Sequence, residues 1–394
     1  MKRGDFFMYQ RIISVLLVGL LLLSAAPTAY AAGPEIAAPS AILMDAATGT
    51  ILYEKNAHEK LAPASVTKVM TLLLVMEALE SGRISWGDTV TASEHAAGKG
   101  GSQVYLEAGE QMSMDEMLKS VVVSSANDCA TALAEHIAGS EAAFVEMMNA
   151  RAAELNLTDT HFVNCTGLDD EPNAAEHLTS AHDIAVMSRE LLKHDDIRKY
   201  TTIWMDTVRD GKFGLSNTNK LVRFYEGTTG LKTGYTSAAG HCLSASAKRD
   251  GIELIAVVLH CASSTDRFQS AKALLDYGFA NYALVSAEPP ETLPAISVRL
   301  GKETSLTPIL QQSAPILIDK AVQAQVTKTV TLEPELEAPV EAGQQVGTMT
   351  VTAGEKTLAQ IPIVAAEGVE KLTLWELTAQ LLRRLCMGTA PTDR

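Results

Sequence analysis

The chain has 394 residues, of which 47% are hydrophobic and 20% are charged, and no tract is of low complexity. These proportions exclude a disordered protein and indicate a chain of two or three domains that buries a large core. The formal net charge is −15. An acidic chain without clustered Lys and Arg repels a phosphate backbone, so we expect no nucleic-acid partner.

Residues 1–31 have the three parts of an export signal. Basic residues precede an apolar run from Ile12 to Leu23, and Ala29 and Ala31 place small side chains where signal peptidase requires them. The run is about 12 residues, shorter than the roughly 20 that a membrane-spanning helix needs. We therefore expect an exported bacterial protein and leave this segment out of the predicted fold. The alternative is that the segment is retained as a membrane anchor.

The cysteines and histidines give no metal or redox signature. The five cysteines include no CxxC pair, and the nine histidines include no H-E-x-x-H pattern. No glycine-rich loop opens a helix after a strand, so we expect neither a metal nor another cofactor. Export permits a disulfide, but buried free thiols are the preferred interpretation. The cysteines are Cys129, Cys165, Cys242, Cys261 and Cys386.

The hydrophobic pattern predicts an α/β (α+β) domain in which both chain ends build one antiparallel sheet and a helical lobe lies between them. Two short apolar strands, Ala41–Asp45 and Thr50–Glu54, form a first hairpin. A long apolar helix over Val66–Leu79 opens the helical part. The other expected elements are helices at Met112–Val123, Asp128–Ala138, Glu141–Leu155 and Ser180–Leu192, strands at Leu231–Gly234, His241–Ala247 and Glu253–Leu259, and a helix at Ser270–Tyr282.

The composition changes near Pro289 and Pro290, which mark a linker. Beyond it, residues 295–365 contain short alternating runs without a helical pattern, as in a small all-β domain. Helical spacing returns at Val369–Met387. The predicted domains are the signal peptide 1–31, a larger domain 32–284, a small all-β domain 285–365, and an amphipathic helix with its tail at 366–394.

Ser65 and Lys68 form an S-x-x-K pattern at the start of the first long helix. Positions three apart lie on one helix face, so the hydroxyl and the amine would point into the same cleft. A serine hydroxyl is a weak nucleophile until a base takes its proton. A lysine near other cations in a partly dry site loses its own proton more easily and can serve as that base. Alone, the pattern also fits a capping serine beside an exposed lysine.

Two further motifs follow in order. Ser125-Ala126-Asn127 supplies a hydroxyl that can relay a proton and an amide that can bind a substrate carbonyl. Lys232-Thr233-Gly234, on a predicted strand, supplies a positive charge, a hydroxyl donor and a glycine that lets a substrate backbone approach. Each motif is unremarkable alone. Their joint presence on a helix start, a loop and a strand favours a catalytic site.

This set resembles the penicillin-recognising serine enzymes, and more closely the low-molecular-mass penicillin-binding proteins that act as serine D-alanyl-D-alanine carboxypeptidases. The resemblance covers almost the whole mature chain and implies a serine β-lactamase/transpeptidase-like fold. Ala126 stands where the family often has Gly, and Cys165 stands where Pro or Thr is commoner. The other matching stretches are Tyr53–Lys68, Phe162–Asn164, Thr166–Leu168, Gly234–Asp250, Glu337–Pro339, Gly343 and Val346–Gly347.

The resemblance implies a role for each motif residue. Ser65 would be the nucleophile and Lys68 its base, and Ser125 would pass the proton on. Asn127 would bind the substrate, and Lys232 would polarise the site. The function implied is removal of the terminal D-Ala from peptidoglycan stem peptides through an acyl-enzyme that penicillins also form.

The remaining implied contacts bind the substrate. Thr233 and Arg267, the latter expected just before the last helix, resemble the pair that holds the terminal carboxylate. The backbone N–H groups of Ser65 and Tyr235 would form the oxyanion hole. For Arg267 a surface position is the open alternative.

Two other functions share these motifs. A β-lactamase of class A would need a water-positioning Glu before K-T-G, but Glu171 and Glu176 lack the Glu-x-x-x-Asn spacing, and the trailing β-domain is foreign to such enzymes. A non-catalytic penicillin-binding sensor would be expected to have lost Ser65 or one of the lysines.

The C-terminal segment predicts attachment to a membrane surface. At about 100° per residue its apolar side chains fall mostly on one half of the helix, with Lys371 and Leu377 as exceptions. It carries too many charges to span a bilayer, so we expect it to lie in the interface, on the outer face of the cytoplasmic membrane. Packing on the β-domain is the alternative. The apolar half comprises Leu372, Leu374, Trp375, Ala379, Leu381, Leu382, Leu385 and Cys386.

Overall fold

The computed structural model describes residues 33–170, 172–311 and 314–387. The export signal predicted at residues 1–31 lies outside them. No helix within these ranges combines the length and the apolar character that crossing a membrane requires.

A five-stranded antiparallel sheet forms the centre of the larger domain, with the strand order β2-β1-β9-β8-β7. The first hairpin therefore pairs with strands that come some 200 residues later in the chain, as the pattern predicted, and β7 is left at an edge. The strands are β1 (Ser40–Asp45), β2 (Ile51–Lys55), β7 (Thr228–Thr236), β8 (Gly240–Arg249) and β9 (Ile252–Cys261).

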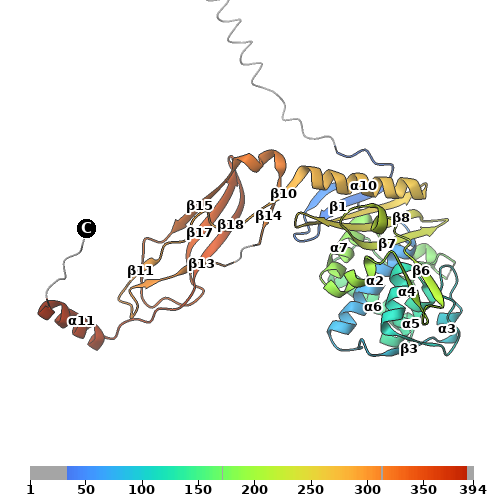
Figure 1. Cartoon of the computed structure of the whole chain (residues 1–394), viewed down its shortest axis with the longest axis horizontal. Helices are drawn as coiled ribbons and strands as arrows, with labels where there is room; N and C mark the ends of the chain where they lie inside the picture. The colour runs from blue at the N-terminus through green and yellow to red at the C-terminus, as the bar shows by residue number, and fades with distance from the viewer. Residues whose placement is uncertain (1–32, 171, 312–313, 388–394) are drawn as a thin grey trace, which may run out of the picture. The chain divides into compact units, whose positions relative to one another are not determined.

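Helices cover both faces of this sheet (Figure 1). Helix α10 (Ser264–Asn281) packs on one face, and α2 (Lys68–Glu80) and α7 (Ala181–Leu192) lie against the other. Strands β8 and β9 are therefore buried on both sides and read as nearly continuous apolar runs. Ser180 caps α7 by accepting a hydrogen bond from the backbone N–H of Asp183.

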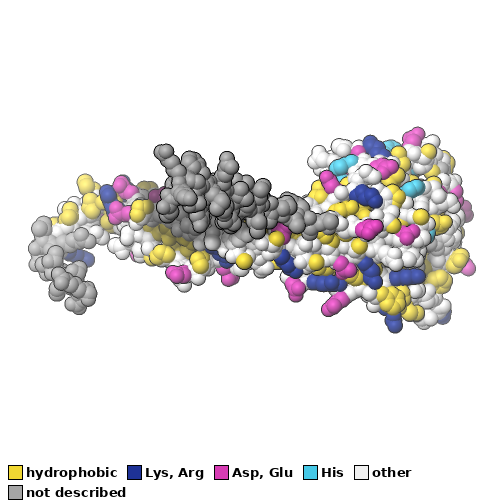
Figure 2. All heavy atoms as spheres, turned by 90° about the horizontal axis from the view of Figure 1, so that it is seen from above, with side chains coloured by type: hydrophobic (Ala, Val, Ile, Leu, Met, Phe, Trp, Pro, Cys, Tyr) yellow, Lys and Arg dark blue, Asp and Glu magenta, His cyan; other side chains and the backbone are white. Residues whose placement is uncertain are grey.

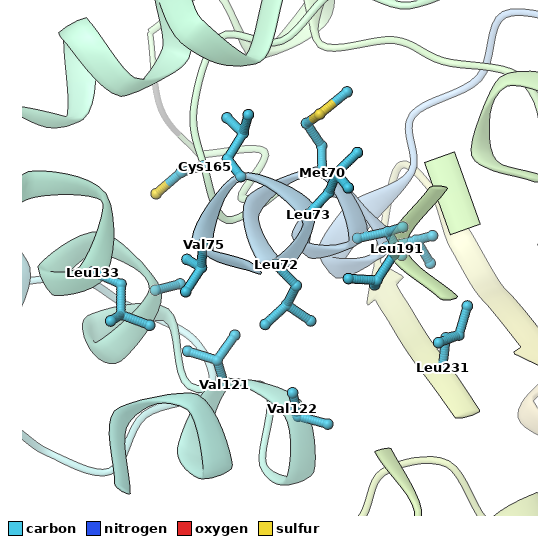
Figure 3. Close-up of a cluster of buried hydrophobic side chains, with 14 of the residues drawn as sticks. Met70, Leu72, Leu73, Val75, Val121, Val122, Leu133, Cys165, Leu191 and Leu231 are labelled. Atoms are coloured by element: carbon cyan, nitrogen blue, oxygen red, sulfur yellow. The ribbon is translucent and has the colours of Figure 1, made fainter. Parts of the chain in front are cut away.

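Helix α2 runs through the middle of the main hydrophobic core. Leu72 and Val75 point toward α4 (Met114–Val123) and α5 (Asn127–Ala138), as Figure 3 shows with Val121 and Leu133. The sequence predicted one helix from Val66, but the structure begins with a 3₁₀ turn, Ala64–Thr67, and α2 follows from Lys68. The tighter turn sets the position of Ser65.

The helical lobe contains two short strand pairs that the sequence analysis missed. The first residues of the helix predicted at Met112–Val123 belong to one of them, and Ser113 caps α4 instead. Strands of three or four residues are too short for a clear alternation. The pairs are β3 (Thr89–Thr91) with β4 (Gln111–Ser113) and β5 (Met205–Val208) with β6 (Phe213–Ser216); the other helices are α3 (Glu94–Ala97), α6 (Glu141–Glu154), α8 (Arg198–Thr201) and α9 (Leu221–Phe224), with 3₁₀ turns at Ala174–Glu176 and Asp195–Ile197.

The C-terminal part is all-β, as predicted, and has its own core around Val346, Met349 and Ile363. Helix α11 starts at Leu374 rather than Val369, because Val369 and Lys371 form bridges with Val340 and Gly301. The strands are β10 (Tyr282–Val285), β11 (Ile296–Arg299), β12 (Ser305–Leu306), β13 (Pro308–Leu310), β14 (Ile316–Asp319), β15 (Val326–Leu332), β16 (Glu335–Glu337), β17 (Gln345–Ala353) and β18 (Lys356–Ala365), with a 3₁₀ turn at Lys320–Gln325 and α11 at Leu374–Met387.

The surface of the larger domain is mixed in charge. Figure 2 shows acidic and basic side chains intermingled over the face that it presents. In the interior, Cys129, Cys165, Cys242 and Cys261 are buried free thiols, which agrees with the preferred interpretation of the cysteines.

We predict that Gly278→Leu destabilises the larger domain by about 1–3 kcal/mol, the usual cost of overpacking a core. A Cβ atom at Gly278 would lie 2.4 Å from Leu254 and 3.0 Å from Leu43, where α10 packs on the sheet. Urea unfolding followed by fluorescence measures the change. Ala280→Leu, on the exposed side of the same helix, is the control and should change little; equal stability of both variants would contradict the packing described.

Candidate active site

The 3₁₀ turn Ala64–Thr67, called the nucleophile turn below because it carries Ser65, lies directly under the edge strand β7. Ser65 is partly exposed, and Ala64 before it has a left-handed backbone with φ +47°. A Cβ at Gly234 would lie 2.7 Å from the carbonyl oxygen of Pro63 and 3.0 Å from the nitrogen of Ser65. The absence of a side chain at Gly234 lets the strand and the Ser65 turn meet. The expected approach of a substrate backbone to Gly234 stays a prediction.

Lys68 is fully buried and reaches three oxygen atoms. Its Nζ lies 3.0 Å from Oγ of Ser65, 2.6 Å from Oδ1 of Asn127 and 2.8 Å from the carbonyl oxygen of Thr166. Burial lowers the pKa of Lys68 to about 7, and the nearby Asp128 is among the acidic groups that oppose this shift. Near neutral pH a substantial fraction of Lys68 is therefore the free amine.

The geometry fixes where the free amine presents its lone pair. The oxygens of Asn127 and Thr166 can only accept hydrogen bonds, so the two remaining N–H groups of neutral Lys68 are directed to them. The lone pair then faces the hydroxyl of Ser65, which can donate its proton. This is the arrangement that a general base for a serine nucleophile requires.

The S-x-N motif supplies the contact with this lysine. Asn127 accepts from Lys68 through Oδ1, donates through Nδ2 to the carbonyl of Gly100 (2.7 Å), and donates its backbone N–H to Ser102 (2.7 Å). Its amide was expected to bind substrate, and in the structure it holds the base. Ser125 is buried just before α5 with a left-handed φ of +64°.

Two residues of the edge strand β7, Lys232 and Thr233, belong to the site. Lys232 is buried, and burial together with the cations Lys68 and Arg267 lowers its pKa well below the usual value, which works against the fixed positive charge expected there. Its Nζ donates to the carbonyl of Thr233 (2.9 Å). The hydroxyl of Thr233 donates to that of Thr218 (2.7 Å), a residue that the sequence analysis did not single out.

Arg267 lies inside α10, not before it, because the helix starts at Ser264. It is only 7% exposed, so the surface alternative is wrong. Its Nη1 donates to the carbonyls of Gly234 (3.0 Å) and Cys242 (3.3 Å). The guanidinium therefore supports the backbone of the edge strand from behind. Tyr235, the next residue of that strand, is 59% exposed.

A buried histidine that the sequence analysis missed holds the nucleophile turn. Nδ1 of His177 accepts from the backbone N–H of Val163 (3.1 Å), so Nε2 carries the proton and donates to Oγ1 of Thr67 (2.8 Å). Thr67 in turn donates to the carbonyl of Ala64 (2.8 Å). Burial lowers the pKa of His177 to about 4, so it stays neutral and the chain of hydrogen bonds stays fixed. No motif marks this residue.

These contacts bring Ser65, Lys68 and Asn127 together directly. Lys232 is coupled to them electrostatically, because the charge of Lys68 lowers its pKa. Such a site, on an antiparallel sheet with an inserted helical lobe, is that of a serine acyl-transfer enzyme.

Comparison with known proteins gives the family. The sequence model described as D-alanyl-D-alanine carboxypeptidase matches residues 27–263, and that of the penicillin-binding protein 5 C-terminal domain matches residues 290–371. The D-alanyl-D-alanine carboxypeptidase DacF of Bacillus subtilis is 41% identical over 92% of this chain and 95% of its own length. DacC of Escherichia coli is 35% identical over 88% of this chain and 89% of its own length.

Solved structures agree with the sequence relatives. Penicillin-binding protein 5 from Haemophilus influenzae is 31% identical and superposes with a TM-score of 0.73 over 86% of this chain and 99% of that one. Penicillin-binding protein D2 from Listeria monocytogenes, solved with ampicillin bound, is 28% identical with a TM-score of 0.57, over 64% of this chain and 100% of that one.

The chain therefore belongs to the D-alanyl-D-alanine carboxypeptidase family of penicillin-binding proteins. It is a serine D-alanyl-D-alanine carboxypeptidase with a function in peptidoglycan metabolism. The predictions of fold and function are confirmed.

We predict that the rate of penicillin acylation rises with pH through a midpoint near the Lys68 pKa of about 7. The protonated amine present below this pH cannot take the proton of Ser65, and the free amine present above it can. Stopped-flow acylation with a fluorescent penicillin between pH 5 and 9 measures the midpoint. A rate that stays constant down to pH 5 would contradict a lysine base.

Proposed function

We propose that Ser65 attacks the carbonyl of the penultimate D-Ala while Lys68 takes the hydroxyl proton. The observation that carries the proposal is the triple contact of Lys68 Nζ, which leaves its lone pair for Ser65. The proton then passes by way of Ser125 to the leaving nitrogen of the terminal D-Ala. Water, deprotonated by the same base, hydrolyses the ester and restores Ser65.

The substrate backbone is proposed to lie along β7, which is one of the two edge strands of the five-stranded sheet. A peptide added at a sheet edge gains backbone hydrogen bonds without any change in the sheet. The N–H groups of Ser65 and Tyr235 would stabilise the oxyanion, each by about 3 kcal/mol. The close approach of Gly234 to the Ser65 nitrogen supports this arrangement.

Lys232, Thr233 and Arg267 form the proposed binding site for the terminal carboxylate. Thr233 would offer the hydroxyl that now donates to Thr218. Arg267 contributes charge from behind the strand, since its hydrogen bonds go to Gly234 and Cys242. Asn127 is proposed to hold Lys68 and to bind the substrate amide once Gly100 releases Nδ2.

We predict that Ser65→Ala and Lys68→Ala abolish both D-Ala release and penicillin labelling, whereas Thr233→Ala mainly lowers kcat/KM for the peptide. The difference follows from role, because proton removal serves both substrates and Thr233 positions the peptide carboxylate. Mass spectrometry of a diacetyl-Lys-D-Ala-D-Ala digest and of the labelled tryptic peptide measures both activities. A penicillin adduct on a peptide without Ser65 would refute the assignment.

We also propose that α11 attaches the enzyme to the outer face of the cytoplasmic membrane. Leu374 and Trp375 are each 82% exposed, and Leu381 and Leu382 are more than half exposed. Trp suits the depth of the headgroups, where an amphipathic helix lies. Leu377, which fell outside the apolar half, is half-buried and lines a hollow with residues of the β-domain.

The domain limits 32–284, 285–365 and 366–394 remain part of this proposal. They are supported by the separate core of the β-domain and by the two family matches. Strand β10 crosses the first limit and pairs with β14 of the small domain.

We predict that deletion of residues 374–394 releases an active enzyme from membranes, because it removes the exposed apolar side chains of α11 and spares the bridges of Val369 and Lys371 to the β-domain. Flotation with anionic phospholipid vesicles compares the full-length and truncated proteins, and penicillin labelling reports activity. Leu374→Gln together with Trp375→Gln should give the same release without deletion. A full-length protein that stays with the soluble fraction, or a truncated one that aggregates, would show that the helix is structural.

A further inference from the structure

The segment Asn164–Gly167 contacts both Lys68 and the turn that carries Ser65. Its Thr166 carbonyl accepts from Lys68. Gly167 has φ +83°, and a Cβ there would lie 1.9 Å from the carbonyl oxygen of Ala64, immediately before the nucleophile. A shift of this segment would therefore move the base and the nucleophile relative to each other.

Three side chains hold this segment in place. Asn164 accepts through Oδ1 from the N–H groups of Thr166 (3.1 Å) and Gly167 (2.7 Å). Thr71, one turn after Lys68, donates to the carbonyl of Cys165 (2.6 Å). The third anchor is distant in sequence. Glu141, the first residue of α6, accepts through Oε1 from the backbone N–H of Cys165 (3.1 Å) and from its thiol (3.2 Å).

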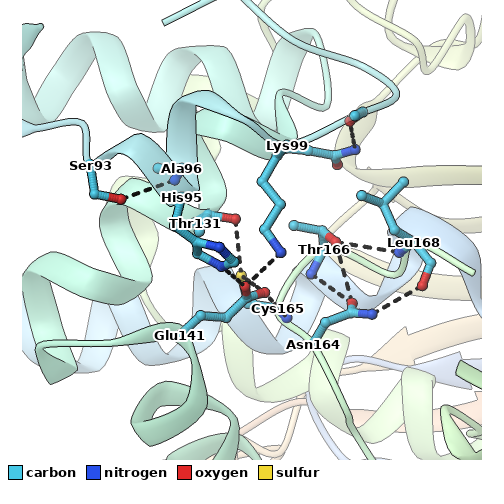
Figure 4. A network of polar contacts seen from close by, with 12 residues as sticks. Ser93, His95, Ala96, Lys99, Thr131, Glu141, Asn164, Cys165, Thr166 and Leu168 are labelled. Atoms are coloured by element: carbon cyan, nitrogen blue, oxygen red, sulfur yellow. Dashed lines mark hydrogen bonds and ion pairs between the residues drawn. The ribbon is translucent and has the colours of Figure 1, made fainter. Parts of the chain in front are cut away.

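Glu141 is in turn held by Lys99 and His95. Its Oε2 lies 2.7 Å from Nζ of Lys99 and 2.7 Å from Nε2 of His95, as Figure 4 shows. Glu141 and Lys99 are both less than 10% exposed. Burial alone would raise the pKa of Glu141, but the hydrogen bonds from Lys99 and His95 outweigh it and lower this pKa to about 2, so Glu141 stays a carboxylate throughout the working range. A buried ion pair of this kind is costly unless its geometry is fixed.

We infer that Glu141 is a positioning residue of the carboxypeptidase reaction, which fixes the Asn164–Gly167 segment so that Thr166 aligns Lys68 with Ser65. Oε1 of Glu141 holds the segment by accepting a hydrogen bond from the backbone N–H of Cys165. Lys99 and His95 bind Oε2 and so fix the carboxylate itself. Glu141 touches no reacting atom. The inference rests on Lys68 acting as the base, as proposed above.

Glu141 also contributes to the field at Lys68. Asp128 and Glu141 are the carboxylates whose charge raises the pKa of Lys68, and Lys68 in turn lowers the pKa of Lys232. Cys165 remains a thiol, because burial raises its pKa well above the usual value. The negative charge of Glu141 favours the protonated form of Lys68. Removal of that charge therefore moves the acid limb of the acylation rate to lower pH, and removal of the Lys99 cation moves it to higher pH.

The test measures the first-order rate constant of penicillin acylation as a function of pH in four variants of the full chain. A single-turnover rate constant does not depend on how much enzyme is folded. Glu141→Ala removes the anchor and should lower the plateau rate about tenfold, since small misplacements at a catalytic group have large effects. Glu141→Gln keeps an acceptor for Cys165 and should restore most of the plateau, with its acid limb at lower pH.

Lys99→Met leaves His95 as the partner of Glu141 Oε2 and should move the acid limb in the opposite direction. Glu154→Ala is the matched control, because Glu154 is an exposed glutamate on the same helix, paired with Arg151. It should leave both plateau and acid limb unchanged.

The inference is overturned if Glu141→Ala keeps the wild-type plateau. It is also overturned if the acid limb of Glu141→Gln does not move to lower pH than wild type and that of Lys99→Met to higher pH. This second comparison decides the matter if Glu141→Ala fails to fold. Lys68→Ala keeps the two proposals distinct. If that variant still acylates, the base assignment fails, whatever Glu141 does.

Discussion

The catalytic site depends on keeping one amine, Lys68, dry and only partly protonated. An exposed lysine would hold its proton and could not activate a serine. Burial at the start of α2 lowers its pKa to about 7, and two accept-only oxygens, from Asn127 and Thr166, direct the remaining lone pair toward Ser65. The surrounding fold holds these two oxygens beside the buried Nζ of Lys68.

The inserted helical lobe follows from that requirement. The two acceptors come from the start of α5 and from the segment Asn164–Gly167, both inside the lobe, while the substrate edge β7 belongs to the sheet. Helix α2 joins the two, because its first residue is the base and its remaining length lies in the core. Lys68 at this junction contacts Ser65 and the two acceptors of the lobe.

The sequence was sufficient for the motif residues and for the order of strands and helices, because both depend on local patterns of residue types. It was not sufficient for partners brought together by tertiary packing. Thr218, His177 and Glu141 have no motif, and their contacts with Thr233, Thr67 and Cys165 join residues 15, 110 and 24 positions apart. Arg267 was expected before the last helix because the predicted start, Ser270, is six residues later than the observed start, Ser264; the polar first turn, Ser264–Asp266, hides the beginning of α10.

The cations of the site support the proposed binding of a terminal carboxylate. Lys232 and Arg267 are buried in a chain of net charge −15, and burial lowers the pKa of each. Lys68 and Arg267 lower the pKa of Lys232 further. Such a cluster is unfavourable without a bound anion. A terminal carboxylate bound beside Thr233 would relieve this repulsion and raise the pKa of Lys232, which would restore the positive charge expected there.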